Sequence, residues 1–137
     1  MVDRFSAMLE AEGMSFYAVE ERASGEFVGA VGLFPVGQLP FAPAMEIGWR
    51  LRPESWGTGY ASEAARASLA HGFGSLGLDE IVAYTTARNV RSQRVTERIG
   101  MIRDAAGDFD HPAFPEGSPL RPHVLYRLQR GDWRPVA

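Results

Sequence analysis

Alternating apolar and polar positions along the chain predict a series of short strands. In and just after the segment 45–51, Ile47, Trp49 and Leu51 alternate with Gly48, Arg50 and Arg52, which is the two-residue period of a half-buried strand. Similar patterns, bounded by turn residues, predict further strands at 16–20, 27–34, 79–86, 101–102 and 123–128.

Apolar residues spaced three or four apart predict three helices. The segment 3–12 carries Phe5, Met8 and Leu9 on one helical face, and Gly13 is a suitable end. A longer helix over 61–76 is predicted to end at Gly77 and to bury Ala61, Ala65, Leu69, Phe73 and Leu76.

The third helix follows Asn89, whose side chain is suited to cap it. Val95 and Ile99 form its apolar stripe, and Gly100 is the expected C-terminal glycine. The predicted element order is α, β, β, β, α, β, α, β, β. This order indicates one α/β domain over 1–137, with an early antiparallel hairpin and a strand–helix–strand crossover in the middle.

Composition excludes several classes of protein. The chain has 137 residues, 45% of them hydrophobic and 23% charged, as in a soluble globular protein. A net charge of −3 argues against nucleic acid as the main partner, and the lack of cysteine removes disulfides and thiolate metal sites. No apolar run approaches the ~20 residues of a membrane span, and the first residues lack the apolar core of a signal peptide. We therefore expect a cytoplasmic protein with no membrane partner.

A glycine turn joins the strand at 45–51 to the helix that begins near Ala61. Gly57 and Gly59 allow close backbone approach, and the first N–H groups of the helix attract anions. The turn is a candidate phosphate cradle, and the alternative is an ordinary turn. It is neither a P-loop nor a complete dinucleotide-binding motif.

Two motifs, EIGWRLRPESWGTGYASEAARA and NVRSQRVTERIGM, resemble the GNAT N-acetyltransferases. The likeness runs over about 16–128 and is greatest to the branch containing the ribosomal-protein N-terminal acetyltransferases. It implies a mixed central sheet with antiparallel early strands, a parallel pair that splays apart around acetyl-CoA, and helices on both faces. From the order of elements, we expect the family's N-terminal strand to be missing. Because an exposed sheet edge favours pairing with another chain, we expect a homodimer.

The resemblance also implies which residues contact acetyl-CoA. Backbone groups of Trp49, Arg50 and Leu51 would bond the pantetheine, and Asn89 and Ser92 would lie beside the thioester. The pyrophosphate would be held by the amides of Trp56, Gly57, Thr58, Gly59, Tyr60 and Ala61. The alternative is that Asn89 is only a helix cap and Ser92 only a first-turn residue.

The implied reaction is direct attack of an amine on the thioester, which needs a base and an acid. Glu46 is the candidate base, through a water, and its alternative is a solvated carboxylate at a strand end. Many family members use a tyrosine as the acid where this chain has Val95 and Thr96. Ser92 is the best local substitute, and two tyrosines are in reserve, each also explained by strand packing: Tyr84 and Tyr126.

Three other groups of residues have competing interpretations. His111 lies in a Pro-rich loop where no metal is expected, and it and His123 are candidates to line the acceptor side. Trp49 and Trp56 are expected to serve as packing and turn anchors. The arginines at helical spacing are expected to form a solvated face, part of which could attract the phosphates of acetyl-CoA: Arg88, Arg91, Arg94 and Arg98.

The leading interpretation is an acetyl-CoA-dependent N-acetyltransferase acting on a primary amine, either a protein N-terminus or a small amine. The alternative is a non-catalytic acyl-CoA-binding or regulatory module on the same fold, which the missing tyrosine favours.

Overall fold

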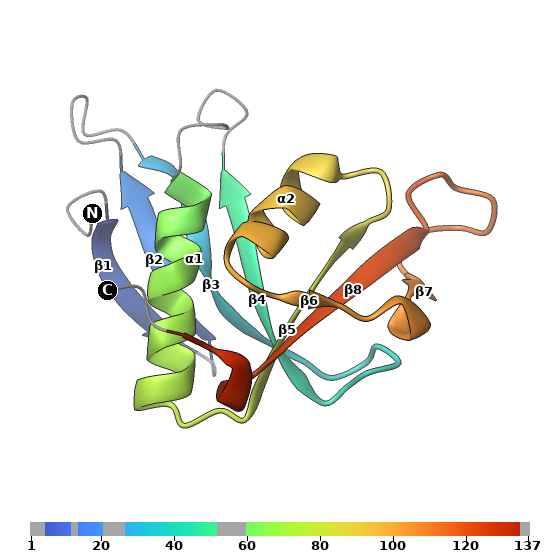
Figure 1. The fold of residues 1–137 in the computed structure, drawn as a ribbon. Coiled ribbons are helices and arrows are strands. Elements are labelled where there is room, and N and C mark those ends of the chain that lie inside the picture. The colour runs from blue at the N-terminus through green and yellow to red at the C-terminus, as the bar shows by residue number, and fades with distance from the viewer. Residues whose placement is uncertain (1–4, 12–13, 21–26, 52–59, 135–137) are drawn as a thin grey trace.

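A single mixed sheet organises the chain. The computed structural model describes residues 5–11, 14–20, 27–51 and 60–134. The strand order is β1-β2-β3-β4-β5-β8-β6, and β7 pairs with β8 (Figure 1). The strands are β1 Phe5–Ala11, β2 Met14–Glu20, β3 Phe27–Val36, β4 Ala44–Leu51, β5 Glu80–Thr86, β6 Ile102–Arg103, β7 Phe109–Asp110 and β8 Pro122–Gln129. The helices are α1 Tyr60–Ala70 and α2 Val90–Arg98, with short helical turns at His71–Ser75, Ala105–Gly107 and Arg130–Asp132.

The first four strands form an antiparallel meander. β2 pairs with β3 and β3 with β4, so that Gly32 is the partner of Phe16 on one side and of Gly48 on the other. The strands predicted at 16–20, 27–34 and 45–51 are confirmed, because alternation reports directly which side chains share a face. The predicted strands at 79–86 and 123–128 are likewise β5 and β8.

The predicted N-terminal helix is wrong. Residues 5–11 form β1, which pairs with β2 from Phe5 opposite Val19 to Ala11 opposite Met14. A ten-residue helix is marginal by itself, whereas the edge of β2 supplies a ladder of hydrogen bonds. The edge of the sheet beside β2 is therefore occupied by β1. The homodimer stays a prediction, with β1 as the strand at that edge.

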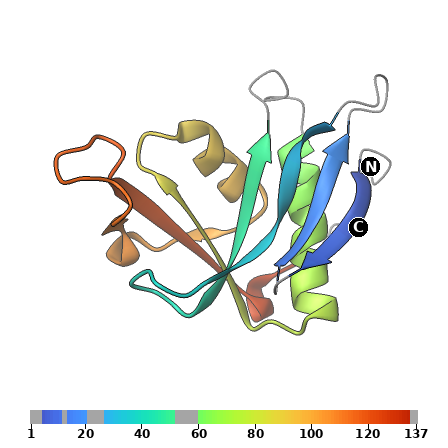
Figure 2. The same cartoon turned by 180° about the vertical axis from the view of Figure 1, so that it is seen from behind.

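Both described helices pack on the same face of the sheet, whereas the resemblance implied helices on both faces. One core cluster contains Leu69 of α1, Ile99 just after α2, and the inward side chains of β3, β4, β5 and β8. In Figure 2 the sheet lies in front of α1. The guanidinium of Arg66 on α1 also donates to the carbonyl of Arg98 at 3.2 Å, which links the two helices. Among the described helices, none is long and apolar enough to cross a membrane.

The helix predicted over 61–76 changes character after Ala70. The turn His71–Ser75 is π-helical, and the N–H of Leu76 donates to the carbonyl of His71 at 3.0 Å. A π turn holds extra residues and so shifts the helical phase. Leu69 and Phe73 are buried as predicted, but Leu76 is 41% exposed, so its predicted burial is wrong.

β4 and β5 are parallel and separate beyond one point of contact. Glu46 and Val82 are their registered partners, and from there β4 runs on to Leu51 and β5 to Thr86 (Figure 1). β3 pairs with the other edge of β4, and β8 with the other edge of β5. The predicted splay is confirmed, and it leaves two strand edges facing a gap.

Asn89 is the N-cap of α2 and lies beside that gap. Its Oδ1 accepts the N–H of Ser92 at 3.1 Å, which confirms the predicted cap. The side-chain Nε2 of Gln93 donates to the carbonyl of Ala87 at 3.0 Å and so fixes the turn before the helix. Gly100, at φ +92°, ends the helix as predicted.

A matched pair of substitutions on one helical segment tests the burial pattern. Leu69→Ala should lower the free energy of unfolding by about 2–5 kcal/mol, because Leu69 is 1% exposed and its loss leaves a cavity. Leu76→Ala should change it by less than about 0.5 kcal/mol. Urea unfolding followed by circular dichroism measures both values. Equal losses would contradict the change of helical phase after Ala70.

The cap of α2 gives a second test. Asn89→Ala should destabilise the protein by about 1 kcal/mol, because the N–H of Ser92 loses its acceptor. Asn89→Asp keeps an acceptor at the same position and should retain most of the stability. Denaturant unfolding compares the two variants. An equal loss of unfolding free energy in both would show that the side-chain acceptor at position 89 does not stabilise the helix.

Candidate active site

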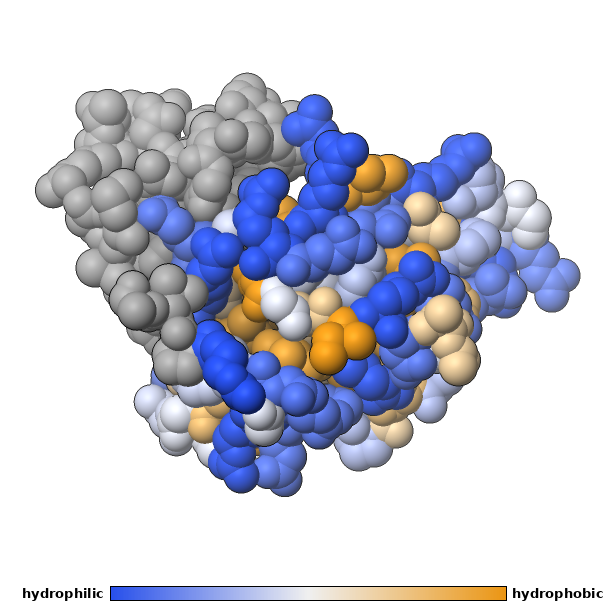
Figure 3. Space-filling view, viewed as in Figure 1, coloured by the Kyte–Doolittle hydropathy of each residue, from blue (hydrophilic) through white to orange (hydrophobic). Residues whose placement is uncertain are grey.

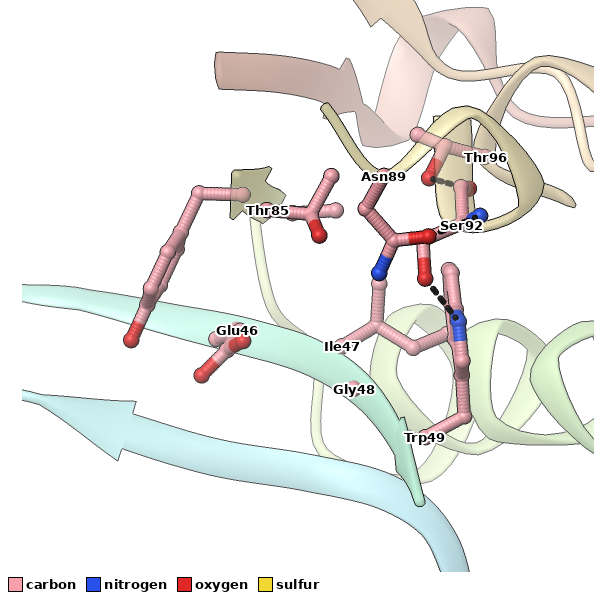
Figure 4. A pocket seen from close by; sticks show the side chains of 10 residues that line it. Glu46, Ile47, Gly48, Trp49, Thr85, Asn89, Ser92 and Thr96 are labelled. Carbon is pink, nitrogen blue, oxygen red and sulfur yellow. Dashed lines mark hydrogen bonds between the residues drawn. The ribbon is translucent and has the colours of Figure 1, made fainter. Parts of the chain in front are cut away.

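A small cavity opens between the separating strands, on the side where α2 begins. Its volume is about 100 Å³, and β4, β5 and α2 all contribute to its wall (Figure 4). The lining residues are Glu46, Ile47, Gly48, Trp49, Ala83, Tyr84, Thr85, Asn89, Ser92 and Thr96. The structure thus brings together four residues that were predicted to belong to the site and that come from two distant segments of the sequence: Glu46, Trp49, Asn89 and Ser92.

Trp49 and Ser92 are joined across the gap. The indole Nε1 of Trp49 donates to the hydroxyl of Ser92 at 3.2 Å, and Figure 4 draws this bond. Because an indole nitrogen only donates, the Ser92 hydroxyl accepts here and keeps its own hydrogen for donation elsewhere. Trp49 therefore orients Ser92, a role beyond the packing expected from the sequence.

The two polar atoms of the Asn89 side chain, Oδ1 and Nδ2, point to different surroundings. Its oxygen caps α2, and Figure 4 shows its Nδ2 pointing into the gap toward β4. From the sequence, helix capping and ligand contact were alternative roles for Asn89. The structure is compatible with both roles at once. An amide N–H₂ directed into a cavity is a donor that fits a carbonyl oxygen.

Glu46 lies on β4 at the other end of this cavity from Asn89 and Ser92 (Figure 4). Gly48 follows it on the same face of the strand. A Cβ at position 48 would lie 3.4 Å from Oε2 of Glu46, so the glycine leaves room beside the carboxylate. Such room is what a bound water or an amine next to this group would need.

Tyr126 is 2% exposed, and its hydroxyl donates to Oε2 of Glu97 at 2.9 Å. Burial, and then the nearby Glu97 carboxylate, raises the pKa of Tyr126. It lines neither cavity described here, so strand packing accounts for it. Tyr84, the other reserve tyrosine, does line the gap.

A second, larger cavity of about 640 Å³ shares Tyr84 with the first. The segments 35–39 and 111–113 form the rest of its wall. Its lining residues are Pro35, Val36, Gly37, Gln38, Leu39, Tyr84, His111, Pro112 and Ala113. Of the two histidines predicted near the acceptor side, His111 lines this cavity, and His123 is buried behind it.

The two histidines belong to a cluster of rings between β5, β7 and β8. The ring centroids of His111 and His123 lie 4.9 Å apart, and that of Tyr84 lies 6.1 Å from His111. Burial, and then the nearby His123, lowers the pKa of His111. Nδ1 of His111 accepts the N–H of Ala113 at 3.1 Å, which places the hydrogen of the neutral ring on Nε2. His111 is therefore an uncharged wall residue at neutral pH.

The arginine series lies outside the cavities. All four members are exposed, as expected of a solvated face: Arg88, Arg91, Arg94 and Arg98. Figure 3 shows a mainly hydrophilic surface over α2. Among the described residues, no group of three or more His, Cys, Asp or Glu is placed to hold a metal ion.

The other predicted cofactor residues lie at the ends of elements or fall outside the described residues. Arg50 and Leu51 end β4, and Tyr60 and Ala61 begin α1. Trp56, Gly57, Thr58 and Gly59 lie outside the described residues.

Sequence reasoning missed much of the cavity wall. Thr85 and Thr96 line the gap, and Ile47 and Gly48 lie between two residues that the motif did identify. Thr85 lies near the end of β5, next to the predicted gap, and this position is the signal that could have found it. No local signal pairs the segments 35–39 and 111–113, which meet only in the folded chain.

Known proteins share both the sequence and the fold. The family model for the acetyltransferase (GNAT) domain matches residues 1–102. The uncharacterized protein YkkB of Bacillus subtilis is 40% identical over 89 residues, which cover 65% of this chain and 51% of YkkB. An enzyme of Aspergillus fumigatus named FsC-acetyl coenzyme A-N(2)-transacetylase is 33% identical over 120 residues, covering 81% of this chain and 49% of that enzyme.

Solved structures agree with the fold. A GNAT-family acetyltransferase from Bacillus anthracis superposes with a TM-score of 0.68 at 31% identity, covering 85% of this chain and 66% of that one. A ribosomal-protein-S5-alanine acetyltransferase from Vibrio fischeri shares the fold, with a TM-score of 0.71 at 22% identity over 89% of this chain and 64% of that one. The chain spans about half the length of the curated relatives it matches. With the family model covering residues 1–102 of 137, the protein belongs to the GNAT acetyltransferase family.

Proposed function

We propose that the protein is an acetyl-CoA-dependent N-acetyltransferase that transfers the acetyl group to a primary amine by direct attack. The observation that carries the proposal is the cavity between β4 and β5. It holds a carboxylate at one end and two hydrogen-bond donors, from Asn89 and Ser92, at the other. Membership of the GNAT family supports it.

The residues around the gap fit the thioester end of acetyl-CoA, which supplies the activated acetyl group. The edge of β4 beyond Glu46 is not paired with β5 in the described register, so its backbone groups are suited to bond the pantetheine. Nδ2 of Asn89 and the hydroxyl of Ser92 supply donors on the opposite side. The amides of residues 56–61 are proposed, on the family resemblance, to hold the pyrophosphate.

Glu46 is proposed as the base. In the transfer, a C–N bond forms between the amine and the acetyl carbon, and the C–S bond of the thioester breaks. The amine proton passes to Glu46 through a water, and the departing thiolate takes a proton. Ser92 is the proposed donor of that proton, because its hydroxyl hydrogen is not used in the bond from Trp49. Ser92 then recovers a proton from water and Glu46 releases its proton to water, which restores both groups.

A non-catalytic acyl-CoA-binding module is the second candidate. Thr96 occupies the part of α2 where many family members carry a tyrosine, and its hydroxyl donates to the carbonyl of Ser92 at 2.8 Å. A chain without that acid could keep the cradle and lack turnover. The acceptor is open between a protein N-terminus and a small amine, and structural relatives include a spermidine N-acetyltransferase of Vibrio cholerae at 19% identity and a TM-score of 0.69.

Thermal unfolding with and without acetyl-CoA tests the binding step. At about a hundredfold above its dissociation constant, acetyl-CoA should stabilise the protein by about 2.7 kcal/mol. The midpoint should then rise by several degrees, and by less with adenosine diphosphate at the same concentration. An unchanged midpoint would remove both the transferase and the binding module.

Release of free CoA thiol, measured with a panel of amines, tests the chemistry. Glu46→Gln should lower kcat by about 10²–10⁴-fold, because it removes the base and keeps the shape of the side chain. Glu116→Gln, at an exposed position that lines neither cavity, is the control and should leave kcat unchanged. Full activity of Glu46→Gln would contradict the assigned base. A parent chain that binds acetyl-CoA but acetylates no amine would favour the binding module.

A further inference from the structure

The larger cavity lies beside the proposed site of transfer. It shares the wall residue Tyr84 with the gap that contains Glu46. Its volume of about 640 Å³ is within the range of about 300–1,000 Å³ that is typical of small-molecule pockets. An amine that reached Glu46 from this side would therefore leave the rest of its body in the larger cavity.

The wall of this cavity is mostly apolar. Val36, Leu39 and the ring of Tyr84 offer apolar contact, together with two prolines and an alanine. Gln38 and His111 are the polar side chains among the described residues that line it, besides the Tyr84 hydroxyl. His111 is uncharged at neutral pH, since burial lowers its pKa and the backbone N–H of Ala113 occupies Nδ1.

Negative charge is scarce around both cavities. Among their described lining residues, Glu46 is the one carboxylate. A further carboxylate, that of Asp110 at the end of β7, has a side chain that is 66% exposed and lies 4.0 Å from the guanidinium of Arg121. One cationic centre in a ligand can therefore be matched at Glu46, and a second would lie against an uncharged wall. A second ammonium there would lose part of its hydration without gaining a carboxylate partner, which is unfavourable.

We propose that the acceptor of this site is a small monoamine with an apolar or aromatic body, rather than a polyamine. Its nitrogen would lie between Glu46 and Tyr84, and its body would pack against Val36 and Leu39. This inference rests on the proposed transferase function and names the class of its acceptor.

Direct binding of two amines to the full chain saturated with CoA tests the inference without requiring turnover. The probes are 2-phenylethylamine and 1,4-diaminobutane, compared by titration calorimetry at pH 7.5. We expect 2-phenylethylamine to bind about tenfold more tightly or better, from burial of its ring. Equal or tighter binding of the diamine, or no binding of either amine, would overturn the inference.

A charge placed in the wall tests the location. Ala113→Asp adds a carboxylate at an exposed position of the lining, where it can pair with the second ammonium of the diamine. The ratio of the dissociation constants of the diamine and the monoamine should therefore fall several-fold. Ala106→Asp adds the same charge at an exposed position outside both linings and should leave the preference unchanged. If both variants shift the preference equally, the larger cavity does not receive the amine.

CoA thiol release with the same two amines separates the two proposals. Acetylation of the diamine in preference to the monoamine would leave the transferase standing and overturn the acceptor class. If 2-phenylethylamine binds with the expected preference but neither it nor any other amine is acetylated, the transferase function fails and the acceptor preference stands as a binding preference.

Discussion

The pairing of β4 with β5 at Glu46 and Val82 is the constraint on which the rest of the site depends. Parallel strands that stayed together would satisfy each other's backbone groups and leave no gap. Because these strands separate after one registered pair, two edges face an opening that needs hydrogen-bonding partners from elsewhere. The start of α2 supplies some of them, and a ligand with amide groups of its own would supply more.

The two sides of this opening are tied together by a few polar contacts and held in place by the core. The bond from Trp49 to Ser92 and the cap at Asn89 are each worth on the order of 1 kcal/mol. The position of α2 rests more on Thr96 and Ile99, which are 2% and 7% exposed. The donors in the gap are thus oriented by weak bonds on a rigid support, which suits a site that must admit and release a ligand.

Charge is distributed unevenly around the site. Exposed arginines lie on and just before α2, Glu46 is the one carboxylate among the described residues that line the two cavities, and the described wall of the larger cavity is mostly apolar. A cofactor with phosphates at one end and an amine with one charge would each meet complementary surroundings. Under the proposed function, the two substrates would approach the point of transfer from different sides, with Tyr84, which lines both cavities, at the boundary between them.

The sequence by itself determined the alternation of apolar and polar positions, which locates strands, and the motifs, which predict site residues. Alternation located β2, β3, β4, β5 and β8, and two motifs identified Glu46, Trp49, Asn89 and Ser92 as site residues, which the fold does bring into one cavity. Tertiary structure decided what local patterns leave open. The spacing of Phe5, Met8 and Leu9 fitted a helix, and pairing with β2 made the segment a strand. A π turn exposed Leu76, and the bond from Trp49 to Ser92 and the larger cavity join segments remote in sequence. Periodicity records which side of an element is apolar, whereas strand partners, helical phase and shared cavities follow from packing between elements that no single stretch of sequence contains.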